Sequence, residues 1–159
     1  MNNEEIYNEY QNSVDKEIVK FVKDVLNHEN KVKYITVGFI SNSTSKELKK
    51  LTGKNVCGNR IVLDENAVLH INKRHGEKGV HDHSMKELDD LGRIGYVLAN
   101  YDSLEYTGIK SYGYLDEEGK PSPVVLFKKR VDGVYYVAEA INSSSKNKCY
   151  IISAYIKKQ

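Results

Sequence analysis

Residues 124–141, Val-Val-Leu-Phe-Lys-Lys-Arg-Val-Asp-Gly-Val-Tyr-Tyr-Val-Ala-Glu-Ala-Ile, decide the fold class of this chain. Two runs rich in β-branched and aromatic residues, 124–131 and 134–141, flank the dipeptide Asp132-Gly133. An Asp-Gly pair between two such runs is a strong signal for a β-hairpin. The stretch therefore predicts two neighbouring antiparallel strands.

Further strands are expected on both sides of this hairpin. Residues 148–156 form a third clear β pattern, and two short tyrosine-rich runs, 103–107 and 111–115, are separated by Gly108. Because these runs follow one another with short connections, we expect an antiparallel meander.

The N-terminal part of the chain has helical patterns instead. Apolar residues recur at steps of three and four, and residues with the side chains of N-caps, such as Asp64 and Ser84, precede two of the patterns. We expect helices over residues 3–28, 45–52, 64–75 and 84–98, and a buried strand over residues 34–40. The predicted fold class is α+β, with N-terminal helices packed on a C-terminal antiparallel β-sheet. We expect residues 1–30 to be a helical extension and residues 31–159 to be the body.

Composition sets limits on function. The chain has 159 residues and a net charge of +2; its seven acids and three lysines within residues 1–30 leave +6 for the remainder. A basic body is compatible with a polyanionic partner. We find no apolar run of membrane-spanning length and no targeting segment at the start, and Cys57 and Cys149 have no partner at metal or redox spacing. A cytoplasmic protein with free thiols is expected, and the apolar stripe of residues 3–28 indicates a packing helix or a dimer contact.

Four of the five histidines lie within residues 61–83 among several cations. They are His70, His75, His81 and His83, accompanied by Lys73, Arg74 and Lys78. Such a mixture suits acid/base chemistry on a phosphate, but it also occurs in weak metal sites and at exposed helix ends. On a helical wheel His75 faces the same side as the apolar residues, whereas His70 and Arg74 lie together at its margin.

The strands add further candidates. Strict alternation would place Cys149, Ile151, Ser153 and Tyr155 on one face of the last strand. Of the consecutive Lys128 and Lys129, one must follow the covered face of its strand. Glu139, flanked by apolar residues, could pair with that lysine or orient a histidine.

A metal site in the histidine-rich loop is disfavoured. His75, His81, Asp82 and His83 could reach one ion, but the His-Glu-x-x-His pattern is absent. We predict neither a metal nor a cofactor.

Several ordered motifs resemble one family. They are His70-Ile-Asn-Lys-Arg-His-Gly76, Asp82-His-Ser-Met85, Asp90-Leu-Gly-Arg-Ile-Gly-Tyr-Val-Leu-Ala-Asn-Tyr-Asp102, Val125-Leu-Phe-Lys-Lys129, Tyr135-Tyr-Val-Ala-Glu-Ala140 and Ser153-Ala-Tyr155. Over residues 34–157 the chain is similar to the phage-type nucleases of the barnase–EndoU–colicin–RelE-like superfamily, found in prophages and mobile elements.

The resemblance implies helices packed on an antiparallel sheet, and metal-independent cleavage of RNA. It maps the active residues onto His75 or His70, Lys128 and the hydroxyls of Ser153 and Tyr155. The residue chemistry adds substrate-binding candidates: Arg74, Lys73, Lys129, His83, Glu139 and Tyr114.

The reaction that fits is attack by an RNA 2′-hydroxyl on the adjacent phosphate, which gives a 2′,3′-cyclic phosphate and a 5′-hydroxyl. We expect a toxin-like endoribonuclease that acts on RNA such as tRNA in a bacterial or phage-infected cell. Its expected partners are a cognate inhibitor and a second copy bound through the N-terminal helix, and it would have no membrane partner. The alternative is a non-catalytic RNA- or protein-binding module, for example a host-defence inhibitor.

Overall fold

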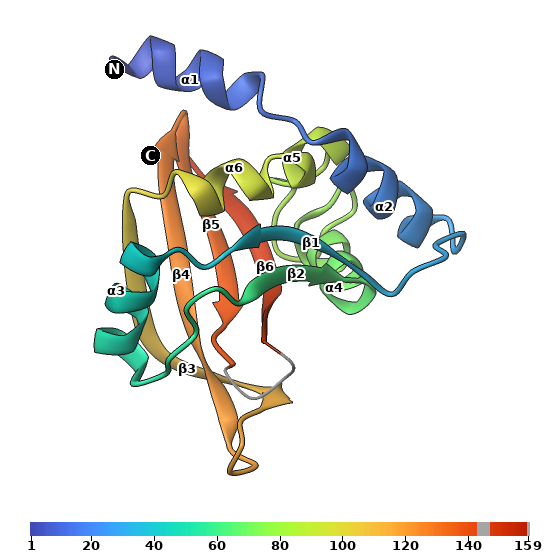
Figure 1. Cartoon of the computed structure of the whole chain (residues 1–159). Coiled ribbons are helices and arrows are strands. Elements are labelled where there is room, and N and C mark those ends of the chain that lie inside the picture. The colour runs from blue at the N-terminus through green and yellow to red at the C-terminus, as the bar shows by residue number, and fades with distance from the viewer. Residues whose placement is uncertain (143–146, 159) are drawn as a thin grey trace.

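The computed structural model describes residues 1–142 and 147–158, and these contain six helices and six strands (Figure 1). The helices are α1 (Asn3–Gln11), α2 (Lys16–Leu26), α3 (Asn42–Thr52), α4 (Glu65–His75), α5 (Leu88–Gly92) and α6 (Ile94–Ala99). The strands are β1 (Tyr34–Phe39), β2 (Arg60–Asp64), β3 (Ser103–Leu115), β4 (Pro121–Val131), β5 (Gly133–Ala140) and β6 (Lys148–Lys157). The predicted α+β class is confirmed.

All six strands form one sheet in the order β1-β2-β6-β5-β4-β3. Every neighbouring pair is antiparallel except β2 and β6, which are parallel over Arg60–Lys148 to Val62–Tyr150. The expected hairpin joins β4 and β5, with Gly133 at a φ of 110° in the turn. Because β2 pairs with β6 only near its start, the later part of β6 meets the loop that follows α4 instead: the Ile156 amide donates to the Ser84 hydroxyl at 3.0 Å.

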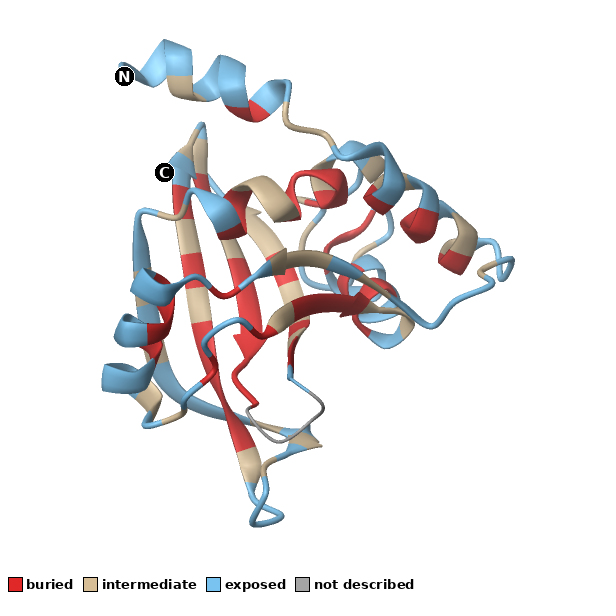
Figure 2. Ribbon diagram, viewed as in Figure 1, coloured by how far each residue is buried: buried red, intermediate tan, exposed pale blue. Residues whose placement is uncertain are grey.

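The sheet has two faces of different chemistry. One, here called the core face, carries apolar side chains that pack with the helices, among them Val125, Phe127, Val137, Ile151 and Ala154. The other, here called the open face, carries Lys128, Tyr136, Ser153, Tyr155 and Lys157, all of them partly or fully exposed. Figure 2 shows the buried residues concentrated along the strands and on the inward sides of the helices.

The alternation of β6 differs from the expectation. Cys149 and Ile151 belong to the core, but so do Ala154 and, in part, Ile156. The register with β5 shifts between Ala138–Ser153 and Glu139–Ile151, which leaves Ile152 as an extra residue in a β-bulge. Ser153 therefore points to the open face, and the prediction that it shares a face with Cys149 is wrong.

The N-terminal helix is broken in two. Asp15 caps α2 by accepting from the amide of Glu17 at 2.9 Å, so residues 12–15 separate α1 from α2. The apolar stripe of α2 is buried within the chain, at Ile18, Phe21, Val22 and Val25. Internal packing thus accounts for the stripe, and a homodimer through this region stays a prediction. Figure 1 shows α1 crossing the end of the sheet where β4 turns into β5.

Other element boundaries also differ from those expected. The helix predicted at residue 84 begins at Leu88, because Glu87 forms the capping box with Asp90 while the Ser84 hydroxyl bonds to β6. β1 is an edge strand with no buried residue, and the two short strands after residue 102 are one strand, β3. By contrast α4 begins directly after its cap, Asp64, as predicted.

Candidate functional site

His75, the last residue of α4, is 4% exposed and lies beside β6. The loop after α4 folds back over the helix end, because the amides of His81 and Asp82 donate to the Arg74 carbonyl at 3.0 and 3.1 Å. Gly79 permits this close approach, since a Cβ there would overlap with the carbonyl oxygens of Asp82 and Arg74. The fold-back places Asp82 next to the His75 ring.

The Nδ1 of His75 lies 3.0 Å from Oδ2 of Asp82, but the two atoms are out of line for a well-directed hydrogen bond. Nδ1 is sealed from solvent, whereas Nε2 is not among the sealed, unbonded atoms of the described residues. Partial burial alone would raise the pKa of Asp82, but hydrogen bonds from Ser84 and the proximity of His75 outweigh it and lower that pKa. Asp82 is therefore held as a carboxylate behind Nδ1, which leaves Nε2 as the nitrogen for chemistry.

Two tyrosines extend from His75 across the open face. The Tyr155 ring stacks on His75 at a centroid distance of 5.2 Å, and the Tyr136 ring stacks on Tyr155 at 5.0 Å. Burial, together with the nearby Tyr136, Glu105 and Asp82, raises the pKa of Tyr155, so its hydroxyl keeps its proton at neutral pH.

Two lysines flank this stack. Lys128 Nζ lies 5.6 Å from the centre of the Tyr136 ring, and Lys157 Nζ lies 5.8 Å from the same ring and 5.6 Å from that of Tyr155. Lys128 also pairs with Glu105 at 2.8 Å, whereas no Asp or Glu of the described residues lies within 4 Å of Lys157. Lys128, Tyr136 and Tyr155 are direct partners on successive strands, so Lys128 is about 10 Å from Tyr155 across the sheet.

The sheet is hollowed beside Lys128. A cleft of about 290 Å³ is lined by Asp102, Ser103, Lys128, Arg130, Val134 and Tyr136. The side chains around it are mostly polar or charged, and the cleft continues the row of His75, Tyr155 and Tyr136. The open face can therefore receive an extended anionic chain along several strands.

Among the predicted catalytic residues, the structure brings His75 and Tyr155 into contact and places Lys128 and Ser153 on the same face. His70 is exposed on α4, one turn before Arg74; partial burial, with the charges of Arg74 and His75, lowers its pKa. Lys73 and Arg74 are likewise exposed on the helix.

Lys129 and Glu139, two predicted substrate-binding residues, lie on the core face instead. Lys129 is 8% exposed and pairs with Asp102 at 3.2 Å. Glu139 is fully buried beside Cys149. Burial of Glu139 raises its pKa to about 8, although the nearby Cys149 thiol lowers it. Both carboxyl oxygens of Glu139 are buried without a hydrogen-bond partner, and no lysine of the described residues lies within 4 Å of them, so Glu139 neither pairs with a lysine nor orients His75.

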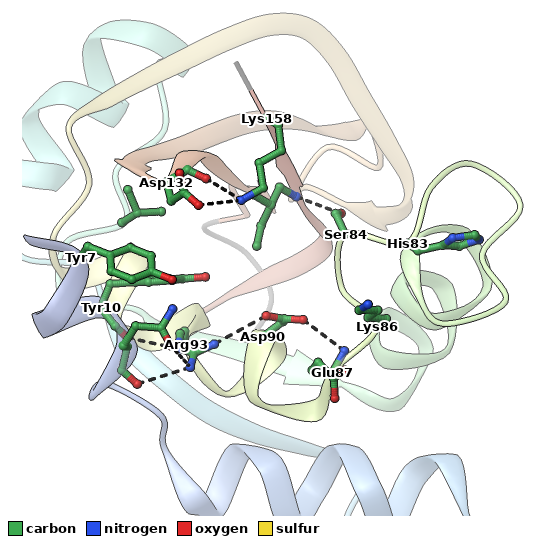
Figure 3. A pocket seen from close by; sticks show the side chains of 13 residues that line it. Tyr7, Tyr10, His83, Ser84, Lys86, Glu87, Asp90, Arg93, Asp132 and Lys158 are labelled. Atoms are coloured by element: carbon green, nitrogen blue, oxygen red, sulfur yellow. Dashed lines mark hydrogen bonds and ion pairs between the residues drawn. The ribbon is translucent and has the colours of Figure 1, made fainter. Parts of the chain in front are cut away.

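Tyr114 and His83 lie away from the His75 ring. The Tyr114 hydroxyl donates to Asp64 at 2.7 Å, at the opposite end of α4. His83 borders a pocket of about 350 Å³ between α1, the loop before α5 and the end of β6. In Figure 3, His83 lies at the far side of this pocket from Tyr7 and Tyr10.

Sequence reasoning missed three groups at this site. The sequence indicates Asp82 as a possible metal ligand and as part of a family motif, but not as a partner of His75, although its spacing from His75 allows a loop to bring the two together. The sequence alone gives no role to Tyr136, whose position opposite Tyr155 depends on the pairing of β5 with β6. Lys157 lies two residues beyond Tyr155. Alternation continued forward from Tyr155 places Lys157 on the same face of β6.

No group of three or more His, Cys, Asp or Glu residues suited to a metal ion occurs within residues 1–142 and 147–158. No helix in the same described part is long and apolar enough to cross a membrane.

In this α+β fold, the open sheet face carries two tyrosines and two lysines beside a histidine that is backed by a carboxylate, an arrangement suited to a phosphodiester. The chain belongs to the family described as phage-Barnase-EndoU-ColicinE5/D-RelE like nuclease 3, whose model matches residues 38–159. The resemblance drawn from the motifs is thereby confirmed, and the match leaves α1 and α2 outside it. Neither the curated proteins nor the solved structures gave a significant match.

Proposed function

We propose that this nuclease is a metal-independent endoribonuclease that uses the ribose 2′-hydroxyl as its nucleophile. The observation that carries the proposal is the contact series Asp82–His75–Tyr155, in which a carboxylate lies 3.0 Å from the imidazole and a protonated phenol stacks against its ring. In-line displacement at phosphorus needs a base at the 2′-oxygen and an acid at the departing 5′-oxygen, on opposite sides of the phosphate, and His75 and Tyr155 are the two groups proposed for these roles.

The reaction proceeds in one displacement. Nε2 of His75 takes the proton of the 2′-hydroxyl while the 2′-oxygen bonds to phosphorus and the bond to the 5′-oxygen breaks. The Tyr155 hydroxyl gives its proton to the departing 5′-oxygen. The products are a 2′,3′-cyclic phosphate and a 5′-hydroxyl, and the proton on His75 later returns to Tyr155 through solvent.

The lysines stabilise the charge that develops on the phosphate. Lys157, which lies against both tyrosine rings, is the nearer cation, and Lys128 is about two strand spacings from Tyr155. Tyr136 provides an aromatic surface on which an unpaired base can stack. Ser153, one position along β6 on the same face, can hydrogen-bond to a phosphate oxygen.

The chemistry is tested by incubating the purified protein with total tRNA in EDTA and mapping the new RNA ends. We expect 5′-hydroxyl and 2′,3′-cyclic phosphate ends at undiminished rate in EDTA. Ends that carry a 5′-phosphate, or loss of cleavage in EDTA, would overturn the mechanism. Intact RNA that is bound in a salt-dependent way would instead support the non-catalytic RNA-binding module.

A toxin-like role in the cytoplasm, with a cognate inhibitor, follows if this RNA cleavage is fast in cells. We expect induced expression in bacteria to stop growth, and His75→Ala to relieve the arrest. Equal toxicity of the wild type and of this variant would contradict that role.

A further inference from the structure

A second cluster of positive charge lies on the open face, at the opposite end of β6 from Tyr155. Lys148 is the first residue of β6, and its register partner on β2 is Arg60. Lys148 Nζ lies 4.3 Å from the centre of the Tyr34 ring on β1, and the Arg60 guanidinium carbon lies 6.0 Å from it. β1, β2 and β6 thus each contribute one side chain to this cluster.

Lys148 is unusual because it is 91% buried without a carboxylate beside it. Its residue exposure is 9%, and no Asp or Glu of the described residues lies within 4 Å of its ammonium or of the Arg60 guanidinium. Residues 143–146, Ser-Ser-Ser-Lys, contain no acid in their sequence. A largely buried lysine without a counter-charge is costly, and a bound anion would offset that cost.

The Tyr34 hydroxyl is the third group of the cluster. Its hydrogen bonds with Lys148 and Arg60, and the charges of these two residues, lower the pKa of Tyr34. The site is therefore electropositive, and it offers three kinds of donor to an anion: an ammonium, a guanidinium and a phenol.

The cluster and the His75 site lie on the same face of the sheet. Cys149 and Ile151 point to the core, so Lys148 and Tyr150 point to the open face; after the bulge at Ile152, Tyr155 does so too. With about 3.3 Å per residue, Lys148 and Tyr155 are roughly 20 Å apart along β6. β6 is one strand over Lys148–Lys157, and its first residues pair with β2.

An aromatic pair lies between the two sites. The rings of Tyr114 on β3 and Tyr150 on β6 stack at a centroid distance of 4.3 Å. Flat aromatic surfaces beside a row of cations are typical of proteins that bind single-stranded nucleic acid, since unpaired bases can stack on them.

We propose that Lys148, Arg60 and Tyr34 bind a backbone phosphate of single-stranded RNA, a few nucleotides away from the phosphate cleaved at His75. The inference rests on the proposed function for the identity of the polyanion. It adds that the substrate lies along β6 on the open face. An RNA that occupies the His75 site and is too short to reach from Tyr155 to Lys148 lacks this contact.

The test uses binding, so that it does not depend on cleavage. Fluorescence anisotropy measures the affinity of labelled, uncleavable 2′-O-methyl oligoribonucleotides of 3 and 12 nucleotides at several salt concentrations. We expect Lys148→Met, which keeps the apolar stem, to weaken binding of the 12-mer about 10-fold, as loss of a charged contact does. It should reduce the salt slope of that binding by about 0.7, the value for one phosphate contact on a single strand.

The 3-mer should bind equally to the wild type and to Lys148→Met. Lys50→Met, an exposed lysine on α3, is the matched control and should leave both affinities unchanged. Arg60→Met, at a more exposed position, is the second variant if Lys148→Met unfolds, and thermal unfolding checks both. Equal losses for both lengths, or no loss for the 12-mer, would overturn the proposal.

The two proposals fail separately. If the wild type cleaves RNA as expected but Lys148→Met binds the 12-mer normally, the phosphate subsite is wrong and the nuclease mechanism stands. If the wild type cleaves nothing but Lys148→Met loses 12-mer affinity, the subsite stands and the catalytic proposal is wrong.

Discussion

The two faces of the sheet use neighbouring residues of the same strands for opposite purposes. On β4, Phe127 is fully buried in the core, whereas Lys128 is partly exposed beside Tyr136. On β5, Val137 packs in the core while Tyr136 stacks on Tyr155. A shift of one residue therefore separates groups that stabilise the fold from groups available to a substrate.

Ionisable groups show the same contrast. In the loop beside the His75 ring, Asp82 keeps its charge because it contacts His75 and Ser84. On the core face, Glu139 has no comparable set of donors, and burial favours its neutral form. The charge state of a carboxyl in this protein thus depends on the hydrogen-bond donors and cations that surround it.

The largest effect is expected at His75. His75→Ala removes the proposed base, so cleavage should fall by about 10² to 10⁴-fold, as for other positioned acid/base groups. Single-turnover cleavage of tRNA measures the loss, and circular dichroism verifies the fold. The matched control is His70→Ala, on the exposed margin of the same helix; a comparable loss in that variant would transfer the role to His70.

The second effect concerns stability and comes from the core face. Glu139 has a folded-state pKa of about 8, well above its value in an unfolded chain, so between about pH 4.5 and 8 the folded state binds more protons than the unfolded state. The free energy of unfolding should therefore decrease as pH rises through this window, on the order of 1 kcal/mol per pH unit.

Glu139→Gln keeps the shape and cannot ionise, so it should flatten that decrease. Urea unfolding from pH 5 to pH 8.5 compares the two proteins. Parallel profiles for the wild type and the variant would show that Glu139 does not carry the pH dependence.

The smallest of these effects is expected at Asp82, a positioning residue. Asp82→Asn removes the charge 3.0 Å from Nδ1 of His75, and cleavage should fall about 10- to 100-fold, because the carboxylate stabilises the imidazolium that forms during the reaction. The pH profile of the cleavage rate distinguishes a role in positioning His75 from a purely structural role. Loss of the neighbouring carboxylate should decrease the apparent pKa of the base in that profile. An unshifted profile would mean that Asp82 only fixes the loop.

Much of this fold could be predicted from local patterns. α4 begins directly after Asp64 and has His75 on its inward side, and the Asp132-Gly133 hairpin is formed as its sequence indicates. Both depend on caps, turns and periodicity within about ten residues, which a sequence displays directly.

The rest of the site depends on longer-range geometry. Strict alternation assigned Ser153 to the wrong face, because the bulge at Ile152 reflects the pairing with β5 and not the residues of β6 alone. Asp82 reaches His75 only because the intervening loop folds back past Gly79. Which of the two consecutive lysines, Lys128 or Lys129, lies on the open face likewise required the register of the sheet.

The most direct measurement of the central claim uses a DNA oligonucleotide that contains a single ribonucleotide. Attack by the 2′-hydroxyl requires that one sugar, so the protein should cut only at the linkage on its 3′ side and leave a 2′,3′-cyclic phosphate there. Cleavage at other linkages, or of the same sequence made entirely of DNA, would contradict the account.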